Sequence, residues 1–168
     1  HISCHAYYQQ RDGDLASFLA SPVDMDRMID TVTGIADEVG AALGESRRIQ
    51  VSFTEWNVWY QDGAASEPPT DWPAAPGLLE DDYDVADAVV VGGLLISLLR
   101  HTDRVTAACQ AQLVNVIAPI RTERGGAAWR QTIFYPFALT SRLARGRVLS
   151  ATVEAPSLAT SKYGDVPS

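Results

Sequence analysis

A glutamate followed by several aromatic residues is the most chemically suggestive feature of the sequence. Glu55 is followed by Trp56, Trp59 and Tyr60, with an amide at Asn57 between them. Flat apolar rings can stack on the face of a sugar, and a carboxylate can attack or stabilise a cationic anomeric carbon. The same residues also fit a structural role, in which an acid at a strand end lies in front of core aromatics. The pattern alone leaves both interpretations open.

The glutamate lies at the end of a predicted β-strand. Residues 49–54 alternate apolar and polar side chains, with the period of two that is typical of a strand. In a regular strand Glu55 shares a face with Ile49, Val51 and Phe53. A β-bulge would reset this phase, and the sequence does not distinguish the two cases.

The other elements alternate between strands and helices. Residues 9–20 are predicted to form a loop, and residues 121–128 a polar loop. Further strands are predicted at 2–8, 105–112 and 147–155, and helices at 21–44, 84–101 and, in part, 129–145. This alternation is typical of parallel strands joined by crossover helices, and therefore of an α/β fold. The pattern does not separate a (β/α) barrel from an open doubly wound sheet, although no GxGxxG motif supports a nucleotide-binding fold.

Local signals predict where the helices begin and end. Ser21 before Pro22, with Asp24 three residues on, predicts an N-cap and a capping box, and Gly44 predicts the helix end. Gly92–Gly93 lowers helix propensity, which indicates close approach of a strand or of a neighbouring chain.

Residues 61–82 are predicted to form a long proline-containing loop of the kind that often serves as a lid or wall of a site. Trp72 in this loop could line a cleft or anchor the loop to the body. We expect the acidic residues 80–82 to cap the helix that follows, because negative charge is favourable at a helix N-terminus.

Composition excludes several classes of function. The chain has 168 residues and a net charge of −8, which argues against nucleic acid and anionic membranes as partners. The uninterrupted apolar run at 88–96 is much shorter than the ~20 residues that span a bilayer. Position 1 is His and the chain ends at Ser168 without a closing element, so we expect a piece of a longer protein.

The cysteines and histidines do not predict a metal site. Cys4 and Cys109 are far apart in sequence and lie in apolar segments, so we expect two buried free thiols. His1 and His5 have a spacing that binds metal on a helix but diverges on a strand. His5 on its own is compatible with an ordinary core histidine.

Several longer segments resemble one known family. FTEWNVWY at 53–60 is similar to the nucleophile motif of the α-L-arabinofuranosidases of glycoside hydrolase family 51, usually written FDEWNVWY, with Thr54 in place of the aspartate. The likeness covers nearly the whole chain. Family segments in the family's order are HISCHAYY at 1–8, LLEDDYDVADAVVVGGLLISLLRHTDRV at 78–105, AQLVNVIAPI at 111–120 and WRQTIFYPFALTSR at 129–142.

The resemblance implies roles for five residues. Glu55 matches the catalytic nucleophile, and His5 and Tyr7 match residues that the family places near it. Trp59 matches an aromatic that walls the sugar pocket. Gln112 matches a glutamine that hydrogen-bonds the arabinose, with Gln110 as the alternative match. The family's acid/base glutamate follows an asparagine, and no Asn-Glu dipeptide occurs in this chain, so that residue is expected upstream.

The resemblance also implies an architecture and an activity. Residues 1–145 would form the last three βα units of a (β/α)8 TIM barrel, and residues 146–168 the first strands of a C-terminal β-sandwich. The whole protein would be a cytoplasmic, retaining, exo-acting enzyme that releases terminal α-L-arabinofuranosyl residues from arabinoxylan or arabinan oligosaccharides. It would need no cofactor or metal and would assemble as a homo-oligomer, a hexamer in the family. The chain alone would be inactive and poorly soluble.

Two other functions are kept as alternatives. One is a related retaining glycosidase with a different sugar specificity. The other is a catalytically silent carbohydrate-binding protein, which an upstream sequence without Asn-Glu would favour.

Overall fold

The computed structural model describes residues 1–61 and 80–167. Within these ranges the chain is an α/β protein built on a parallel sheet of three strands in the order β1-β2-β3. The predicted loop at 61–82, with Trp72, lies largely outside the described residues. The elements are β1 (Ile2–Tyr8), α1 (Leu15–Leu19), α2 (Pro22–Ala42), β2 (Val51–Val58), α3 (Val85–Arg100), β3 (Val105–Gln110), β4 (Ile120–Thr122), β5 (Ala128–Arg130), α4 (Phe134–Leu143), β6 (Ser157–Thr160) and β7 (Gly164–Pro167).

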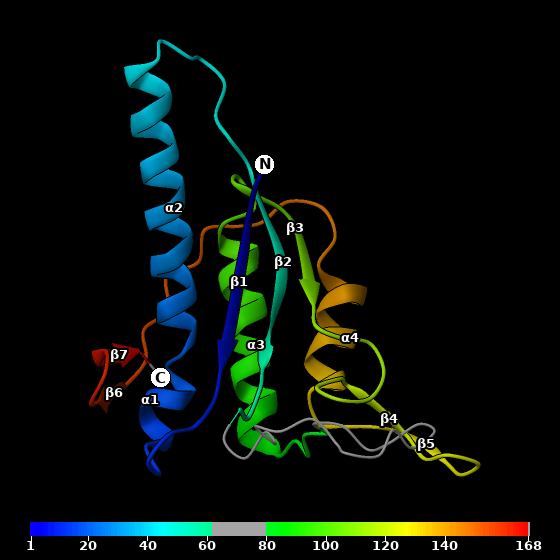
Figure 1. Cartoon of the computed structure of the whole chain (residues 1–168). Helices are drawn as coiled ribbons and strands as arrows, with labels where there is room; N and C mark the ends of the chain where they lie inside the picture. The colour runs from blue at the N-terminus through cyan, green and yellow to red at the C-terminus, as the bar shows by residue number, and fades with distance from the viewer. Residues whose placement is uncertain (62–79, 168) are drawn as a thin grey trace, which may run out of the picture.

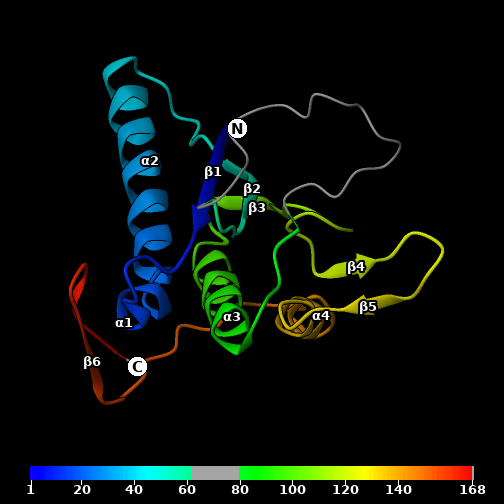
Figure 2. The ribbon, with the colours of Figure 1, turned by 60° about the horizontal axis from the view of Figure 1, so that its bottom comes forward.

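Helices α2 and α3 connect the three parallel strands and contact each other along the sheet (Figure 1). Their apolar faces form one core with the sheet. Met25 and Ile29 of α2 and Leu94 of α3 are fully buried together with Phe53 and Trp56 of β2. Helix α4 packs against α3, and the view in Figure 2 shows α2, α3 and α4 side by side. This arrangement confirms the predicted alternation of parallel strands and crossover helices.

Strand β1 has two different faces because its side chains alternate. Cys4, Ala6 and Tyr8 are buried towards the helices, whereas His5 and Tyr7 lie on the opposite face. The face away from the helices therefore carries polar side chains.

A β-bulge at Thr54 places Glu55 of β2 on the same polar face of the sheet as His5 and Tyr7. Cys4 pairs with Phe53 and His5 pairs with Glu55, so Thr54 is an extra residue in β2. Because of this residue, Glu55 faces away from the helices with Thr54 instead of sharing the buried face of Phe53. Of the two cases that the sequence left open, the structure has the bulged one, and β2 continues past the glutamate to Val58.

Several local predictions were wrong near the helix ends. The loop expected at 9–20 contains helix α1, which Asp14 caps by accepting a hydrogen bond from the backbone N–H of Ser17. Ser21 makes no capping bond, because its hydroxyl donates to the carbonyl of Phe18 in the preceding turn. Gly44 ends α2 with a positive φ of 71°, as predicted.

Helix α3 is capped by the residue directly before it and not by the acidic residues 80–82 that were expected to cap it. Asp84 is the N-cap and forms a capping box with Asp87. Of the residues expected to cap it, Asp82 pairs with Arg121 instead, and Asp81 accepts a hydrogen bond from the backbone N–H of Tyr60.

The close approach predicted at Gly92–Gly93 is present, but the neighbours are helices. A Cβ at Gly93 would lie 2.5 Å from Cγ of Pro22, and one at Gly92 would lie 3.7 Å from Cβ of Pro136. Glycine at position 93 therefore allows the start of α2 to pack against α3.

The C-terminal segment and one cysteine also differ from expectation. The strand predicted at 147–155 is not formed, because that segment is exposed and pairs with no strand in the described part of the chain. Strands β6 and β7 form a hairpin after Pro156 instead, and β4 and β5 form another where a loop was expected. Cys4 is buried as predicted, whereas Cys109 is exposed.

Candidate functional site

The carboxylate of Glu55 lies on the polar face of the sheet beside two side chains of β1. The hydroxyl of Tyr7 donates a 2.7 Å hydrogen bond to Oε2 of Glu55, and Nδ1 of His5 lies 3.5 Å from the same oxygen. The Glu55 side chain is 46% exposed. In the described part of the chain both contacts go to Oε2, so Oε1 is left open to an incoming group.

Tyr7 acts as a hydrogen-bond donor over a wide pH range. Burial raises its pKa above the usual value of about 10, and the hydrogen bond to Glu55 and the negative charge of Glu55 raise it further. The phenol therefore stays protonated at neutral pH and holds one carboxylate oxygen in place.

Thr54 and Ser3 extend the contacts of His5 away from the carboxylate. Oγ1 of Thr54 lies 2.8 Å from Nε2 of His5 and 2.6 Å from Oγ of Ser3. His5 therefore lies between a hydroxyl on one ring nitrogen and the carboxylate of Glu55 on the other.

Trp59 stands against Tyr7 at the end of the sheet. The two rings meet edge to face, with centroids 5.1 Å apart and planes inclined by 72°. The backbone N–H of Trp59 donates to the carbonyl of Tyr8 at 2.8 Å, which continues the pairing of β1 and β2 beyond the last strand residue. The aromatic wall predicted beside the glutamate is therefore next to the tyrosine that holds it.

Two aspartates fix the chain that follows Trp59. The backbone N–H of Tyr60 donates to Asp81 at 2.8 Å, and the hydroxyl of Tyr60 donates to Asp87 at 2.7 Å. Burial raises the pKa of both aspartates above the ordinary value. These contacts connect the end of β2 to the start of α3.

Gln112 lies beyond β3 on an exposed turn. Its amide lies 3.5 Å from the carbonyl of Val114 and 3.4 Å from that of Asn115, and the Ala111–Gln112 peptide bond is cis. The alternative match, Gln110, donates to Oδ1 of Asn57 at 3.0 Å instead. Gln112 is therefore the more exposed glutamine, with its side chain near the turn's own backbone.

Asn57 has a structural role in the site that the sequence did not predict. It is fully buried, and its amide donates to the carbonyls of Ala111 and Ile117. These bonds attach the turn that carries Gln112 to the strand that carries Glu55. Its position two residues after Glu55, on the same strand face, was the available signal.

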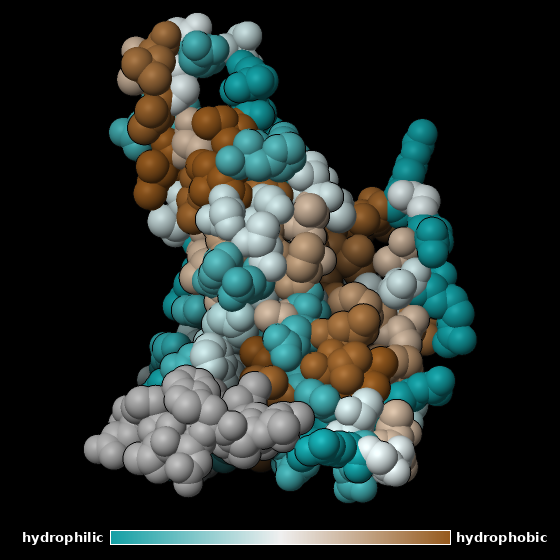
Figure 3. Space-filling model, turned by 45° about the vertical axis from the view of Figure 1, so that its right-hand side comes forward, coloured by the Kyte–Doolittle hydropathy of each residue, from teal (hydrophilic) through white to brown (hydrophobic). Residues whose placement is uncertain are grey.

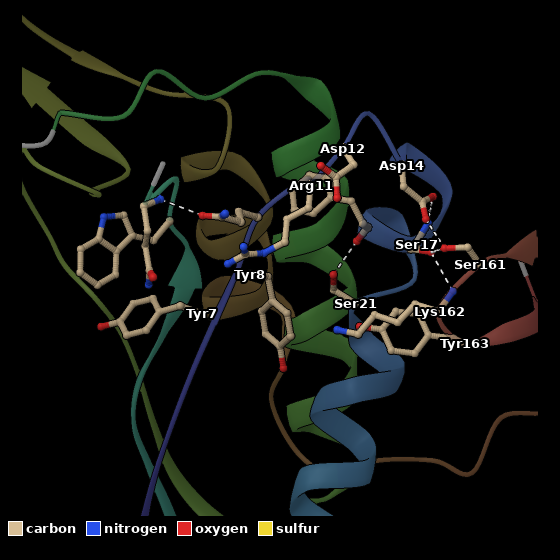
Figure 4. Close-up of a pocket in the computed structure, with 14 residues that line it drawn as sticks. Tyr7, Tyr8, Arg11, Asp12, Asp14, Ser17, Ser21, Ser161, Lys162 and Tyr163 are labelled. Carbon is tan, nitrogen blue, oxygen red and sulfur yellow. Dashed lines mark hydrogen bonds between the residues drawn. The ribbon is translucent and has the colours of Figure 1, made fainter. Parts of the chain in front are cut away.

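A pocket of about 480 Å³ lies at the end of β1, where Tyr7 and Trp59 form part of its lining. Arg11 and Asp12 contribute to one side and Lys162 to another (Figure 4). Figure 4 shows the ring of Tyr7 pointing away from these charged residues. Glu55 does not line this pocket, so the carboxylate and the pocket are distinct features.

Neither a metal site nor a membrane segment is found in the residues described. Across 1–61 and 80–167, no group of three or more His, Cys, Asp or Glu side chains could hold a metal ion. Over the same ranges, none of the helices is long and apolar enough to cross a membrane.

Comparison with known proteins identifies the family. The protein-family model described as the α-L-arabinofuranosidase C-terminal domain matches residues 54–166 of the chain. The chain belongs to this family. The matched region begins inside β2, one residue before Glu55, and runs to the end of the β6–β7 hairpin.

The relatives of this chain are named as arabinofuranosidases. It is 58% identical over 98% of its length to the intracellular exo-α-(1→5)-L-arabinofuranosidase of Streptomyces lividans. It is 54% identical over 99% of its length to the exo-α-(1→6)-L-arabinofuranosidase of Bifidobacterium longum. A solved structure of a family 51 α-L-arabinofuranosidase from Bifidobacterium longum matches 98% of the chain with a TM-score of 0.89 and 48% identity.

These matches cover only part of each relative. The chain spans 25% of the Streptomyces protein, 34% of the Bifidobacterium exo-α-(1→6) enzyme and 34% of the solved Bifidobacterium structure. The chain therefore corresponds to about a quarter to a third of each of these relatives.

Proposed function

We propose that this chain supplies the nucleophile of a retaining α-L-arabinofuranosidase. The observation that carries the proposal is the carboxylate of Glu55, which Tyr7 holds by Oε2, while Oε1 has no hydrogen bond or ion pair to the residues that the structure describes. A nucleophile needs one fixed and unobstructed oxygen, and the exposed face of a parallel sheet provides the approach for a substrate.

The reaction would proceed in two displacements. Oε1 of Glu55 attacks the anomeric carbon, the bond to the leaving oxygen breaks, and a second carboxylic acid protonates that oxygen. The same second group then removes a proton from water, which attacks the glycosyl ester and releases arabinose with its original configuration. The two carboxyl groups of a retaining enzyme stand roughly 5–5.5 Å apart.

The second carboxylic acid is expected upstream of this chain. In the family resemblance it follows an asparagine, and the only asparagines here, Asn57 and Asn115, both precede valine. The chain alone is therefore expected to hydrolyse no arabinofuranoside at a measurable rate.

Exposed apolar side chains support a barrel in which additional βα units cover this surface. On α2, Ile35, Val39 and Leu43 are more than half exposed, and Figure 3 shows hydrophobic surface at the upper end of the molecule. We propose that residues 1–145 are the last three βα units of a (β/α)8 barrel and that residues 146–168 begin a C-terminal β-sandwich. The remaining units would cover these apolar residues, and the chain without them is expected to be poorly soluble.

The substrates would be arabinose-containing oligosaccharides attacked at their non-reducing ends. Relatives are named for α-(1→5) and for α-(1→6) linkages at similar identity, so the linkage is left open. Several relatives are named intracellular, which supports a cytoplasmic location. The protein would assemble as a homo-oligomer, a hexamer by family resemblance, and would need no cofactor.

The test is a nucleophile-rescue experiment on the full-length polypeptide. Wild type, Glu55→Ala and the exposed-residue control Glu154→Ala are assayed on aryl α-L-arabinofuranosides with and without azide. Of the three proteins, we expect only Glu55→Ala to be inactive without azide. Azide should restore its turnover, and the product should be a glycosyl azide of inverted configuration. A Glu55 variant with wild-type activity would refute the proposal, and activity on other aryl glycosides only would indicate a different sugar specificity.

A further inference from the structure

The extra residue of the β2 bulge places a hydroxyl against the histidine that faces the carboxylate. Oγ1 of Thr54 contacts Nε2 of His5 at 2.8 Å, and Nδ1 of the same ring lies 3.5 Å from Oε2 of Glu55. Ser3 completes the series with its hydroxyl 2.6 Å from that of Thr54. Four side chains from two adjacent strands therefore lie in one continuous series.

Donor and acceptor rules give this series a direction. An ionised carboxylate only accepts, so a neutral His5 has to carry its proton on Nδ1 if its 3.5 Å contact with Glu55 is to become a hydrogen bond. Nε2 is then an acceptor, and the hydroxyl of Thr54 must donate to it. The lone pairs of Thr54 are left to accept from Ser3.

We propose that Thr54 is a positioning residue that holds His5 in the Nδ1–H tautomer and thereby orients the nucleophile Glu55. This inference rests on the proposed function of Glu55. A histidine without a donor at Nε2 could instead carry its proton there, and would then present a lone pair to the carboxylate. The 3.5 Å contact is longer than a formed hydrogen bond, and such contacts commonly shorten when substrate binds.

Tyr7 and Thr54 would restrain Glu55 in different ways. Tyr7 donates directly to Oε2, whereas Thr54 acts only through the ring of His5. Loss of Thr54 should therefore reduce activity less than loss of Tyr7, and should change the state of His5.

The experiment compares Thr54→Val with Thr54→Ser in the full-length polypeptide. Valine removes the hydroxyl at nearly constant volume, and serine keeps it. We expect Thr54→Val to lower kcat by about tenfold, as for the loss of one hydrogen bond, and Thr54→Ser to stay within about twofold of wild type. Ser3→Ala, which leaves β2 unchanged, should give a smaller loss of about threefold.

A matched control lies in the same sheet. The hydroxyl of Thr106 in β3 also contacts a histidine, since it lies 2.9 Å from Nε2 of His1. Thr106→Val therefore removes the same group from a neighbouring strand and should leave kcat unchanged.

The tautomer is read directly from side-chain ¹⁵N chemical shifts of histidine-labelled full-length protein. We expect the Nδ1–H form of His5 in wild type and in Thr54→Ser, and a shift towards Nε2–H in Thr54→Val. An unchanged tautomer in Thr54→Val, or a serine variant as impaired as the valine variant, would overturn the inference. Because the shifts are measured without substrate, they test it even if the full-length wild type hydrolyses no arabinofuranoside.

Discussion

Tyr7 reaches Glu55 diagonally across two parallel strands. In the register of β1 and β2, Tyr7 pairs with Asn57, and the partner of Glu55 is His5. The phenol nevertheless donates at 2.7 Å to a carboxylate two residues back along the neighbouring strand. The carboxylate therefore has His5 beside it and Tyr7 towards the end of the sheet that carries Trp59.

Removing the Tyr7 hydroxyl should slow catalysis while leaving the fold intact. A hydrogen bond to a charged group contributes about 1.5–3 kcal/mol, so Tyr7→Phe should lower kcat by about 10- to 100-fold in the full-length enzyme. Steady-state kinetics on an aryl α-L-arabinofuranoside measure the change. The exposed Tyr135 provides the control, and an equal loss in Tyr135→Phe would contradict a specific role for Tyr7.

Trp59 should matter for substrate binding through its ring. Its edge-to-face contact with Tyr7 is lost in Trp59→Leu, and so is a flat surface for a sugar. We expect KM to rise and kcat/KM to fall about tenfold, with a partial effect in Trp59→Phe. Trp129, which packs on Arg121 in the β4–β5 hairpin, is the matched control, and Trp129→Leu should keep wild-type kinetics.

Two glycines in helices should respond in opposite directions to the same substitution. Gly93→Ala would place Cβ 2.5 Å from Cγ of Pro22 and should lower the melting temperature. Gly34 in α2 has nothing within 4 Å of such a Cβ, so Gly34→Ala should stabilise by up to about 1 kcal/mol. Thermal melts of the two variants test the pair, and stabilisation by Gly93→Ala would show that α2 and α3 do not pack as described.

The Arg104–Asp37 pair should make stability depend on pH in acid. Arg104 is buried and donates to both oxygens of Asp37, and its hydrogen bonds hold the pKa of Asp37 below the ordinary value of 3.8. A lowered pKa stabilises the fold above the ordinary pKa, and this contribution is lost as the pH falls through the lowered value.

Denaturant midpoints between pH 7 and pH 3 measure this contribution. Asp37→Asn should be less stable than wild type at pH 7, and the difference should narrow below about pH 4. Arg48, an exposed arginine 3.4 Å from Asp37, is the control, because Arg48→Gln should change stability little. A difference that is constant across the pH range would contradict the assignment.

The alternation of side chains predicted most of the sheet and its helices, because strand and helix periods are local properties. His5, Tyr7 and Glu55 were expected together, and the structure brings them together, although their catalytic roles stay predictions. The bulge at Thr54 could not be predicted, because a bulge is defined by pairing with β1 and not by β2 alone.

Other differences have equally specific causes. The sequence Asp12-Gly13-Asp14 is typical of a turn and indicated a loop at 9–20, but its last residue is the N-cap of helix α1. The segment 147–155 has a strand-like composition but pairs with no strand among the residues described. The structural role of Asn57 was not predicted, because it depends on carbonyls more than fifty residues away in sequence. The role predicted for Gln112 stays a prediction.

The bulge at Thr54 separates two design problems along one strand. Side chains up to Phe53 can be repacked against α2 and α3 without changing the direction in which Glu55 points. Deletion of Thr54 would restore regular alternation and leave Glu55 on the polar face directly after Phe53, but it would also remove the hydroxyl that contacts His5. An engineer could therefore vary side-chain volume before the bulge, or delete the bulge residue, without burying the carboxylate, but only the first change keeps the contact between Thr54 and His5.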